Sequence, residues 1–209
     1  MKIAVLASGR GSNFQALLDA IREGVLPAGI CVVLSNNSAS GVLEIARAAN
    51  IPAIHLSQKQ FPSEDAFSSR MLSVLGDHGA DFVALAGYMK RIPATVVAHY
   101  RNKITNIHPA LLPSFGGPGM YGMRVHDAVI ASGVKLSGAT VHLVDEEYDR
   151  GPIVLQKSVE VTFEDNPETL AAKVLAIEHE IYPLALKAFA EDRVRLKGTT
   201  LWIRSSRVP

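Results

Sequence analysis

The feature that most limits the possible fold is the alternation of short apolar runs with amphipathic segments in the first half of the chain. Continuous apolar runs at 3–7, 30–34 and 82–87 are typical of parallel strands buried on both faces, and the second strand is expected over 30–35. Segments with helical spacing follow the first two runs, over 14–21 and 41–49. This order predicts right-handed crossovers between parallel strands. We therefore expect an α/β, Rossmann-like fold, an open, mostly parallel twisted sheet with helices on both faces.

The second half of the sequence predicts further strands and the longest helix. The segments 136–144 and 153–161 should pair as a hairpin-like extension of the sheet, and a terminal hairpin is expected over 193–203. A long helical pattern starts after Asn166. The chain is long enough for one substantial core, and no linker divides it. We therefore expect a single domain over residues 1–209.

Charge and composition exclude several classes of protein. The net charge is +1 and the basic residues are scattered, which argues against a nucleic-acid partner. Cys31 is the one cysteine, so no disulfide forms within the chain, and its apolar surroundings predict a small core residue. Apolar runs are far shorter than a membrane span or a signal-peptide core. We expect a cytoplasmic protein without a membrane partner, a monomer or a homodimer, that acts on small molecules.

Two polar side chains stand near the end of the apolar run that starts at Ile104. Residues two apart in a strand point to the same side, so Asn106 and His108 should face one space and address one atom. Pro109 and Pro113 stiffen the following segment and bias His108 toward extended geometry. A histidine at a strand end is more often structural than catalytic, so this pair alone does not establish an active site.

An acidic loop after the segment 136–144 supplies a partner for this imidazole. A carboxylate at Asp149 can orient His108 and stabilise its protonated form. The acidic residues at 145–147 are expected to be solvated loop charges. For His142, in the strand before the loop, a structural role is favoured over catalysis.

A glycine-rich turn joins the first apolar run to the first helix. Backbone N–H groups and the helix dipole at such a position favour an anion, and Gly11, Ser12 and Asn13 are the candidate ligands of a phosphate. The side chains of Ser12 and Asn13 can instead cap the helix. The turn is not the dinucleotide fingerprint, because the third glycine and the acidic residue after the second strand are missing. A tight turn without a ligand is the alternative.

Three of these segments are expected to meet at one crevice. Ligands of open α/β sheets bind beyond the carboxyl ends of the strands, where 9–13, 87–92 and 106–108 lie. The glycine-rich segment 114–123 follows the last of them. We expect it to be a loop that closes over ligands, and the alternative is a tolerated insertion.

Together the motifs resemble the signature of the folate-dependent formyltransferases. They read Asn-Ile-His-Pro-x-Leu-Leu-Pro over 106–113, Gly-x-Thr-Val-His over 138–142 and Asp-x-Gly-Pro-Ile over 149–153. The resemblance implies that Asn106, His108 and Asp149 are the catalytic trio. It is much more specific than any single motif, and it covers nearly the whole chain.

The resemblance also implies the substrates. The Ser-Gly-x-Gly-Ser-Asn turn over 8–13 is similar to the phosphate-binding turn of family members that act on phosphoribosylglycinamide. The implied reaction transfers the formyl group of 10-formyltetrahydrofolate to the glycinamide amine, in purine biosynthesis, without a metal.

Further site residues are implied by position alone. Glu178 matches a carboxylate that contacts the substrate. His126 matches a histidine of related enzymes and is a secondary candidate for the site, because most histidines in helices are structural or solvated. Glu64 departs from the family, which often has an arginine there for the glutamate tail of the folate. The implied folate-binding residues are Tyr88, Met89, Lys90, Arg91, Ile92 and Val144.

The motifs are also compatible with other functions. Within the family, the alternatives are the hydrolase that releases formate from the same folate and the formyltransferases of amino sugars. From a different class, the chain can be a non-catalytic module that binds phosphate or folate. The presence of Asn106, His108 and Asp149 together argues against that module, because binding alone does not require them.

Overall fold

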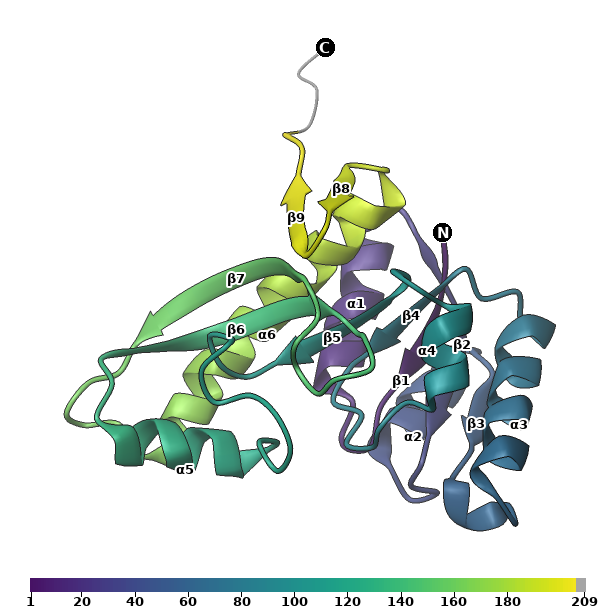
Figure 1. Ribbon diagram of the computed structural model, residues 1–209, viewed down its shortest axis with the longest axis horizontal. Helices are drawn as coiled ribbons and strands as arrows, with labels where there is room; N and C mark the ends of the chain where they lie inside the picture. The colour runs from purple at the N-terminus through teal and green to yellow at the C-terminus, as the bar shows by residue number, and fades with distance from the viewer. Residues whose placement is uncertain (206–209) are drawn as a thin grey trace. The chain divides into compact units, whose positions relative to one another are not determined.

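A computed structural model describes residues 1–205 of the chain (Figure 1). These residues form two compact units, Met1–Asn106 and the part from Ile107 onward. Each unit has its own strands and helices.

Parallel strands form the sheet of the first unit, in the order β3–β2–β1–β4–β5. Strand β1 lies at the centre between β2 and β4, and its residues from Ile3 to Leu6 are almost completely buried. Burial on both faces explains why this strand is a continuous apolar run. The bounds are β1 (Lys2–Leu6), β2 (Gly29–Ser35), β3 (Ala53–His55), β4 (Phe82–Leu85) and β5 (Ile104–His108), whose last two residues belong to the second unit.

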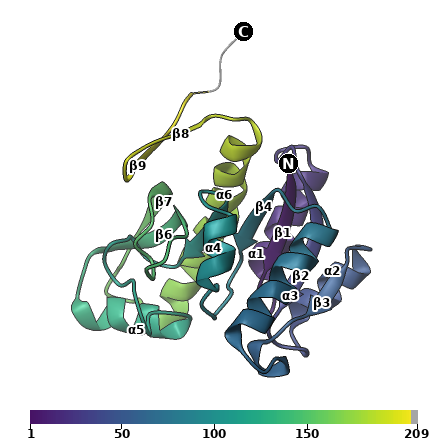
Figure 2. The ribbon, with the colours of Figure 1, turned by 45° about the vertical axis from the view of Figure 1, so that its right-hand side comes forward.

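Helices cover both faces of this sheet. Helices α1 and α2 lie on one face and α3 and α4 on the other (Figures 1 and 2), as right-handed crossovers in this strand order require. The carboxyl ends of β1, β2 and β4 are therefore left to loops. The bounds are α1 (Ser12–Arg22), α2 (Gly41–Ala48), the short 3₁₀ helix η1 (Gln58–Gln60), α3 (Glu64–Asp77) and α4 (Ala94–His99).

The second unit is built on an antiparallel hairpin. Helix α6 packs on both strands of this hairpin, β6 and β7, and on α5 (Figure 1). Helix α6 starts where the sequence predicts, because the Asn166 side chain accepts a hydrogen bond from the N–H of Thr169 and Pro167 occupies the first turn. The bounds are α5 (Met123–Ser132), β6 (Leu136–Leu143), β7 (Ile153–Glu160), α6 (Pro167–Ala190), and the separate hairpin β8 (Val194–Lys197) with β9 (Thr200–Ile203).

The predicted α/β class with an open, mostly parallel sheet is confirmed. That the chain is one domain stays a prediction. The expected core position of Cys31 was wrong: the residue is half-buried, because the first residues of β2 are still partly accessible. Within residues 1–205, no helix combines the length and apolar character needed to cross a membrane.

Candidate active site

His108 ends strand β5, and its side chain is almost completely buried in the second unit. Its Nε2 lies 2.8 Å from the carbonyl oxygen of Phe115. A carbonyl can only accept, so Nε2 carries the hydrogen and donates it, and Nδ1 of the neutral ring is bare. Nδ1 lies 3.7 Å from Oδ2 of Asp149. A proton that arrives on Nδ1 therefore faces a carboxylate.

Asp149 lies in the loop between β6 and β7 and is contacted on both carboxylate oxygens. Its backbone is left-handed, with a φ of 55°, a conformation that aspartate tolerates better than most residues. Oδ2 accepts a hydrogen bond from the N–H of Gly117 at 2.9 Å. Oδ1 lies 3.5 Å from Nε2 of His142. The carboxylate is thereby oriented from two sides.

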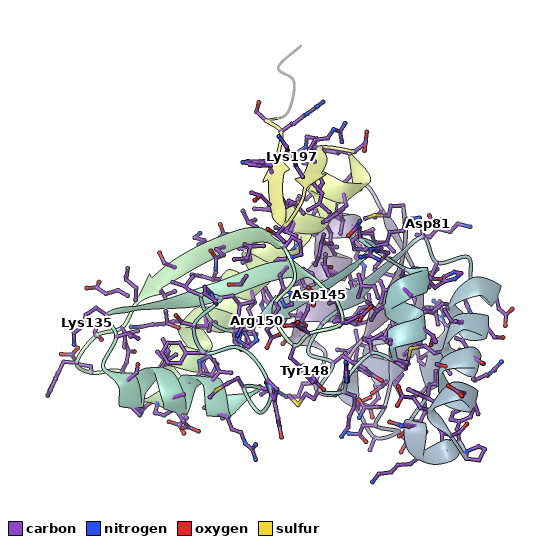
Figure 3. All side chains as sticks on the ribbon, in the orientation of Figure 1. Asp81, Lys135, Asp145, Tyr148, Arg150 and Lys197 are labelled. Atoms are coloured by element: carbon purple, nitrogen blue, oxygen red, sulfur yellow. The ribbon has the colours of Figure 1, made fainter. Side chains whose placement is uncertain are left out.

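The charged and aromatic side chains on either side of Asp149 face solvent. Asp145, Tyr148 and Arg150, labelled in Figure 3, are exposed, whereas Asp149 is half-buried. The acidic residues at 145–147 are all exposed, as the sequence predicts. Asp149 is therefore the loop carboxylate that reaches the histidines.

His142 is the residue whose position the sequence analysis did not anticipate. Its side chain is buried in β6, and Nδ1 lies 2.8 Å from the carbonyl oxygen of Leu143, to which it donates. This contact fixes the ring with Nε2 toward Asp149. The available signal was its place in the Thr-Val-His motif, three residues before the first acidic residue of the loop, Asp145.

Burial decides the charge of His108. It lowers the pKa of the imidazole below its ordinary value of 6.5, although the carboxylate of Asp149 and the hydrogen bond to Phe115 raise it in part. Asp149 thus acts in the direction that the sequence predicts and favours the protonated ring, but burial has the larger effect on this pKa. Burial thereby favours the neutral form of this imidazole.

The same site keeps Asp149 ionised. Burial alone would raise the pKa of this carboxyl, but the contacts with His142, His108 and the N–H of Gly117 outweigh burial and hold the pKa below its usual value. The pair at rest is thus a neutral imidazole beside a carboxylate.

The glycine-rich segment packs its backbone against this pair. Phe115 has a φ of 55° and Gly117 a φ of 95°, and their main-chain atoms contact His108 and Asp149. A Cβ at Gly116 would lie 2.5 Å from Cδ2 of Leu112 and 3.2 Å from Cβ of Asp149. The segment is thus part of the candidate site. A tolerated insertion without a role would not explain these contacts. Closure over ligands stays a prediction.

A buried network holds the segment that follows His108. Oγ1 of Thr140 donates to the carbonyl of Ala110 and accepts from the N–H of Leu112, at 2.6 and 3.0 Å. Nε2 of Gln156, which lies opposite Thr140 in the β6–β7 register, donates to both Thr140 Oγ1 and the Leu112 carbonyl at 2.9 Å. Both strands of the hairpin therefore fix the backbone near His108.

Two further predicted residues are buried in the second unit. His126 lies on α5, its Nδ1 has no hydrogen-bond partner among the described residues, and burial lowers its pKa. Glu178 is buried on α6. Their contact with a substrate stays a prediction.

The predicted phosphate turn lies in the first unit, at the start of α1. Gly11 has a φ of 89°, and a Cβ there would lie 2.9 Å from Cα of Val42 in α2. The N–H of Val42 donates to the carbonyl of Gly9 at 3.2 Å. The N-cap residue of α1 is Gly11, which has no side chain that could accept from the first N–H groups of the helix. This geometry suits an anion at the helix start.

The predicted folate-binding segment follows β4 in the same unit. Tyr88 and Ile92 are buried, whereas Met89, Lys90 and Arg91 are exposed. Burial raises the pKa of Tyr88 to about 12, so this side chain stays neutral. Val144, the remaining predicted folate residue, is half-buried after the end of β6 in the second unit. The residues described here include no group of three histidine, cysteine or acidic side chains placed to hold a metal ion.

Comparison with known proteins identifies similar enzymes. A family model described as formyl transferase matches residues 1–186. Phosphoribosylglycinamide formyltransferase of Escherichia coli is 35% identical over 209 residues, which cover 100% of this chain and 96% of the relative. The chloroplastic enzyme of the same name from Arabidopsis thaliana is 43% identical, and the alignment covers 93% of this chain and 67% of that protein.

Solved structures give the same result. Glycinamide ribonucleotide transformylase 1 from Symbiobacterium toebii superposes with a TM-score of 0.92 at 40% identity, over 98% of this chain and 94% of that one. A formyltetrahydrofolate deformylase from Pseudomonas syringae has a TM-score of 0.87 at 28% identity, over 98% of this chain and 66% of that one.

Proposed function

We propose a function for this chain on the basis that it belongs to the formyl transferase family. The proposed reaction transfers the formyl group of 10-formyltetrahydrofolate to the glycinamide amine of phosphoribosylglycinamide in purine biosynthesis. The relatives from Escherichia coli and Arabidopsis thaliana carry the name of this activity. The structural observation that carries the proposal is the position of Nδ1 of His108, 3.7 Å from Oδ2 of Asp149.

The reaction requires one proton acceptor and one stabilised oxyanion. The glycinamide nitrogen attacks the formyl carbon, a new C–N bond forms, and the formyl oxygen takes up negative charge. The amine then loses a proton, the bond from the formyl carbon to the folate nitrogen breaks, and that nitrogen is protonated as it leaves.

His108 is proposed to carry the proton. Because it starts neutral, its bare Nδ1 can accept the proton of the attacking amine. The resulting imidazolium forms beside Asp149, whose charge stabilises it during the transfer. The ring then returns the proton to the leaving folate nitrogen, and the enzyme is restored.

Asn106 is proposed to stabilise the oxyanion. It lies two positions before His108 on β5, and its amide donates hydrogen bonds without a change of charge. A preorganised donor of this kind acts mainly on the transition state, so its loss should reduce turnover more than substrate binding.

The remaining predicted residues are proposed to bind the substrates. The phosphate lies on the N–H groups at the start of α1, from Gly11 to Asn13, and this anchor places the glycinamide amine for attack. Glu178 contacts the same substrate, and His126 is a secondary candidate for this contact. The folate is held by 88–92 and by Val144.

We also propose a cytoplasmic enzyme that works as a monomer or homodimer on small molecules, without a nucleic-acid or membrane partner. A phosphorylated substrate does not cross a membrane unaided, so the enzyme and its substrate must share a compartment. Size-exclusion chromatography coupled to light scattering gives the oligomeric state directly.

Formyl transfer is tested by following the absorbance of the folate with and without phosphoribosylglycinamide. We expect turnover that depends on the acceptor and that His108→Ala abolishes. His99→Ala is the matched control, because His99 is exposed on α4 and should leave the rate unchanged. Acceptor-dependent turnover that survives in His108→Ala contradicts the assigned role.

The hydrolase is the second candidate, because a formyltetrahydrofolate deformylase is among the similar structures. Release of formate at the same rate without an acceptor would identify this activity. A rate that appears only with an amino sugar would instead identify a sugar formyltransferase.

A further inference from the structure

Ser8 lies in the first unit between the end of β1 and the predicted phosphate turn, and it contacts the turn after β4 twice. Its backbone N–H donates to the carbonyl of Gly87 at 3.0 Å. Its Oγ accepts a hydrogen bond from the N–H of Met89 at 2.8 Å. One residue therefore holds the turn Gly87–Met89 at both ends.

A third hydrogen bond orients the hydroxyl of Ser8. Oγ donates its hydrogen to Oδ1 of Asn36, at 2.5 Å, from the loop after β2. A hydroxyl has one hydrogen and two lone pairs, so donation to Asn36 leaves the lone pairs for the N–H of Met89. The serine thus joins the carboxyl ends of three neighbouring strands, β1, β2 and β4.

The contact determines what this turn can offer to a ligand. The N–H of Met89 is donated within the protein, so it holds the turn in place. Gly87 has a φ of 79°, and the turn places Tyr88 in the core while the side chain of Met89 is half exposed. Without the hydroxyl, the N–H of Met89 would lose its partner and the turn would lose one of its two attachments.

We propose that Ser8 is a positioning residue that fixes the Gly87–Met89 turn for folate binding. The inference rests on the proposed function for the identity of the ligand at this turn. One of the two contacts of Ser8 with the turn is made through its side chain, whereas the proposed phosphate ligands are the backbone N–H groups from Gly11 to Asn13. Loss of the hydroxyl should therefore weaken folate binding selectively.

The test compares Ser8→Ala with the wild type in steady-state formyl transfer. We expect KM for 10-formyltetrahydrofolate to rise about three- to tenfold, the effect of one lost hydrogen bond. KM for phosphoribosylglycinamide and kcat should stay within about twofold, because no assigned contact to either depends on the hydroxyl.

Ser40→Ala is the matched control. Its side chain is buried and its hydroxyl donates to Oγ of Ser35, the last residue of β2, at 2.8 Å, but it does not touch the Gly87–Met89 turn. The control should lower the thermal midpoint without changing KM for the folate. If Ser40→Ala reproduces the folate defect, or if Ser8→Ala raises both KM values equally, the positioning role is wrong.

Direct titration of tetrahydrofolate by calorimetry separates the two proposals. A wild type that binds no folate overturns the proposed function itself. A wild type and a Ser8→Ala variant that bind folate equally overturn only the role of Ser8. If Ser8→Ala does not fold, Ser8→Thr is the replacement test, because it keeps the hydroxyl oxygen. A folded Ser8→Thr variant whose KM for 10-formyltetrahydrofolate is within about twofold of the wild type supports the role. A tenfold higher KM for this folate contradicts it.

Discussion

Nε2 of His142 lies 3.5 Å from Oδ1 of Asp149, while the other oxygen of that carboxylate faces His108. The carboxylate is thus held between two imidazoles, and only one of them has the role of proton carrier in the proposed mechanism. The N–H of Gly117 donates to this carboxylate and helps to fix its position.

Replacing the carboxylate should reduce turnover while leaving the phosphate site intact. In Asp149→Asn the imidazolium of His108 loses its stabilising charge, and we expect kcat to fall on the order of 10²-fold. KM for phosphoribosylglycinamide should change little. Asp145→Asn, in the same loop but exposed, is the control for steady-state kinetics (Figure 3). Near-normal turnover in Asp149→Asn would refute the assignment.

The pH profile should report the neutral state of His108. Burial lowers the pKa of this ring, and the ring must be neutral to accept a proton. Turnover should therefore fall in acid only as the pH drops through a pKa that lies below 6.5. Asp149 raises this pKa in part, so the acid limb of Asp149→Asn should move to lower pH. An acid limb that moves to higher pH in this variant would show that the carboxylate acts differently.

The network around Thr140 should contribute to stability. Thr140→Val keeps the volume but removes the hydroxyl that bonds to Ala110, Leu112 and Gln156. Thr140 is fully buried, so these groups lose a partner that water does not replace, and we expect a loss of about 2–4 kcal/mol in the free energy of unfolding. Thr95→Val, at an exposed position of α4, should change it by less than about 0.5 kcal/mol in the same urea titration.

A side chain at position 116 should disturb catalysis rather than overall stability. The Cβ of Gly116→Ala would meet Leu112 and the side chain of Asp149, so the carboxylate must shift by a few tenths of an ångström. We expect kcat to fall roughly tenfold, since small misplacements at a reacting centre are costly. Gly76→Ala in α3, where a Cβ has no atom within 4 Å, should leave kcat unchanged. Equal kcat values for the two variants would show that Leu112 and Asp149 accommodate the new Cβ, and the prediction would then be wrong.

The strands and long helices were predictable because their signals are local. Apolar runs marked β1 and β2, and the Asn-Pro pair marked the start of α6. Helix α4 was not anticipated, because its six residues are fewer than two helical turns and show no period.

The site was predictable only in its side-chain chemistry. His108 and Asp149 could be named from their motifs, and the structure brings them together. The carbonyl of Phe115 and the N–H of Gly117 could not, because every residue offers a carbonyl and nearly every residue an N–H. The direction of the pKa of His108 also depends on packing, which no spacing of residues reports.

The glycine-rich segment contacts His108 and Asp149 through main-chain atoms, the oxygen of Phe115 and the nitrogen of Gly117. A new side chain at position 115 leaves its carbonyl in place as the acceptor, whereas deleting one residue displaces both contacts. An engineer who wishes to adapt this enzyme to another amine should therefore keep the length of the segment fixed. The outward side chains, such as that of Tyr121, are the part to randomise.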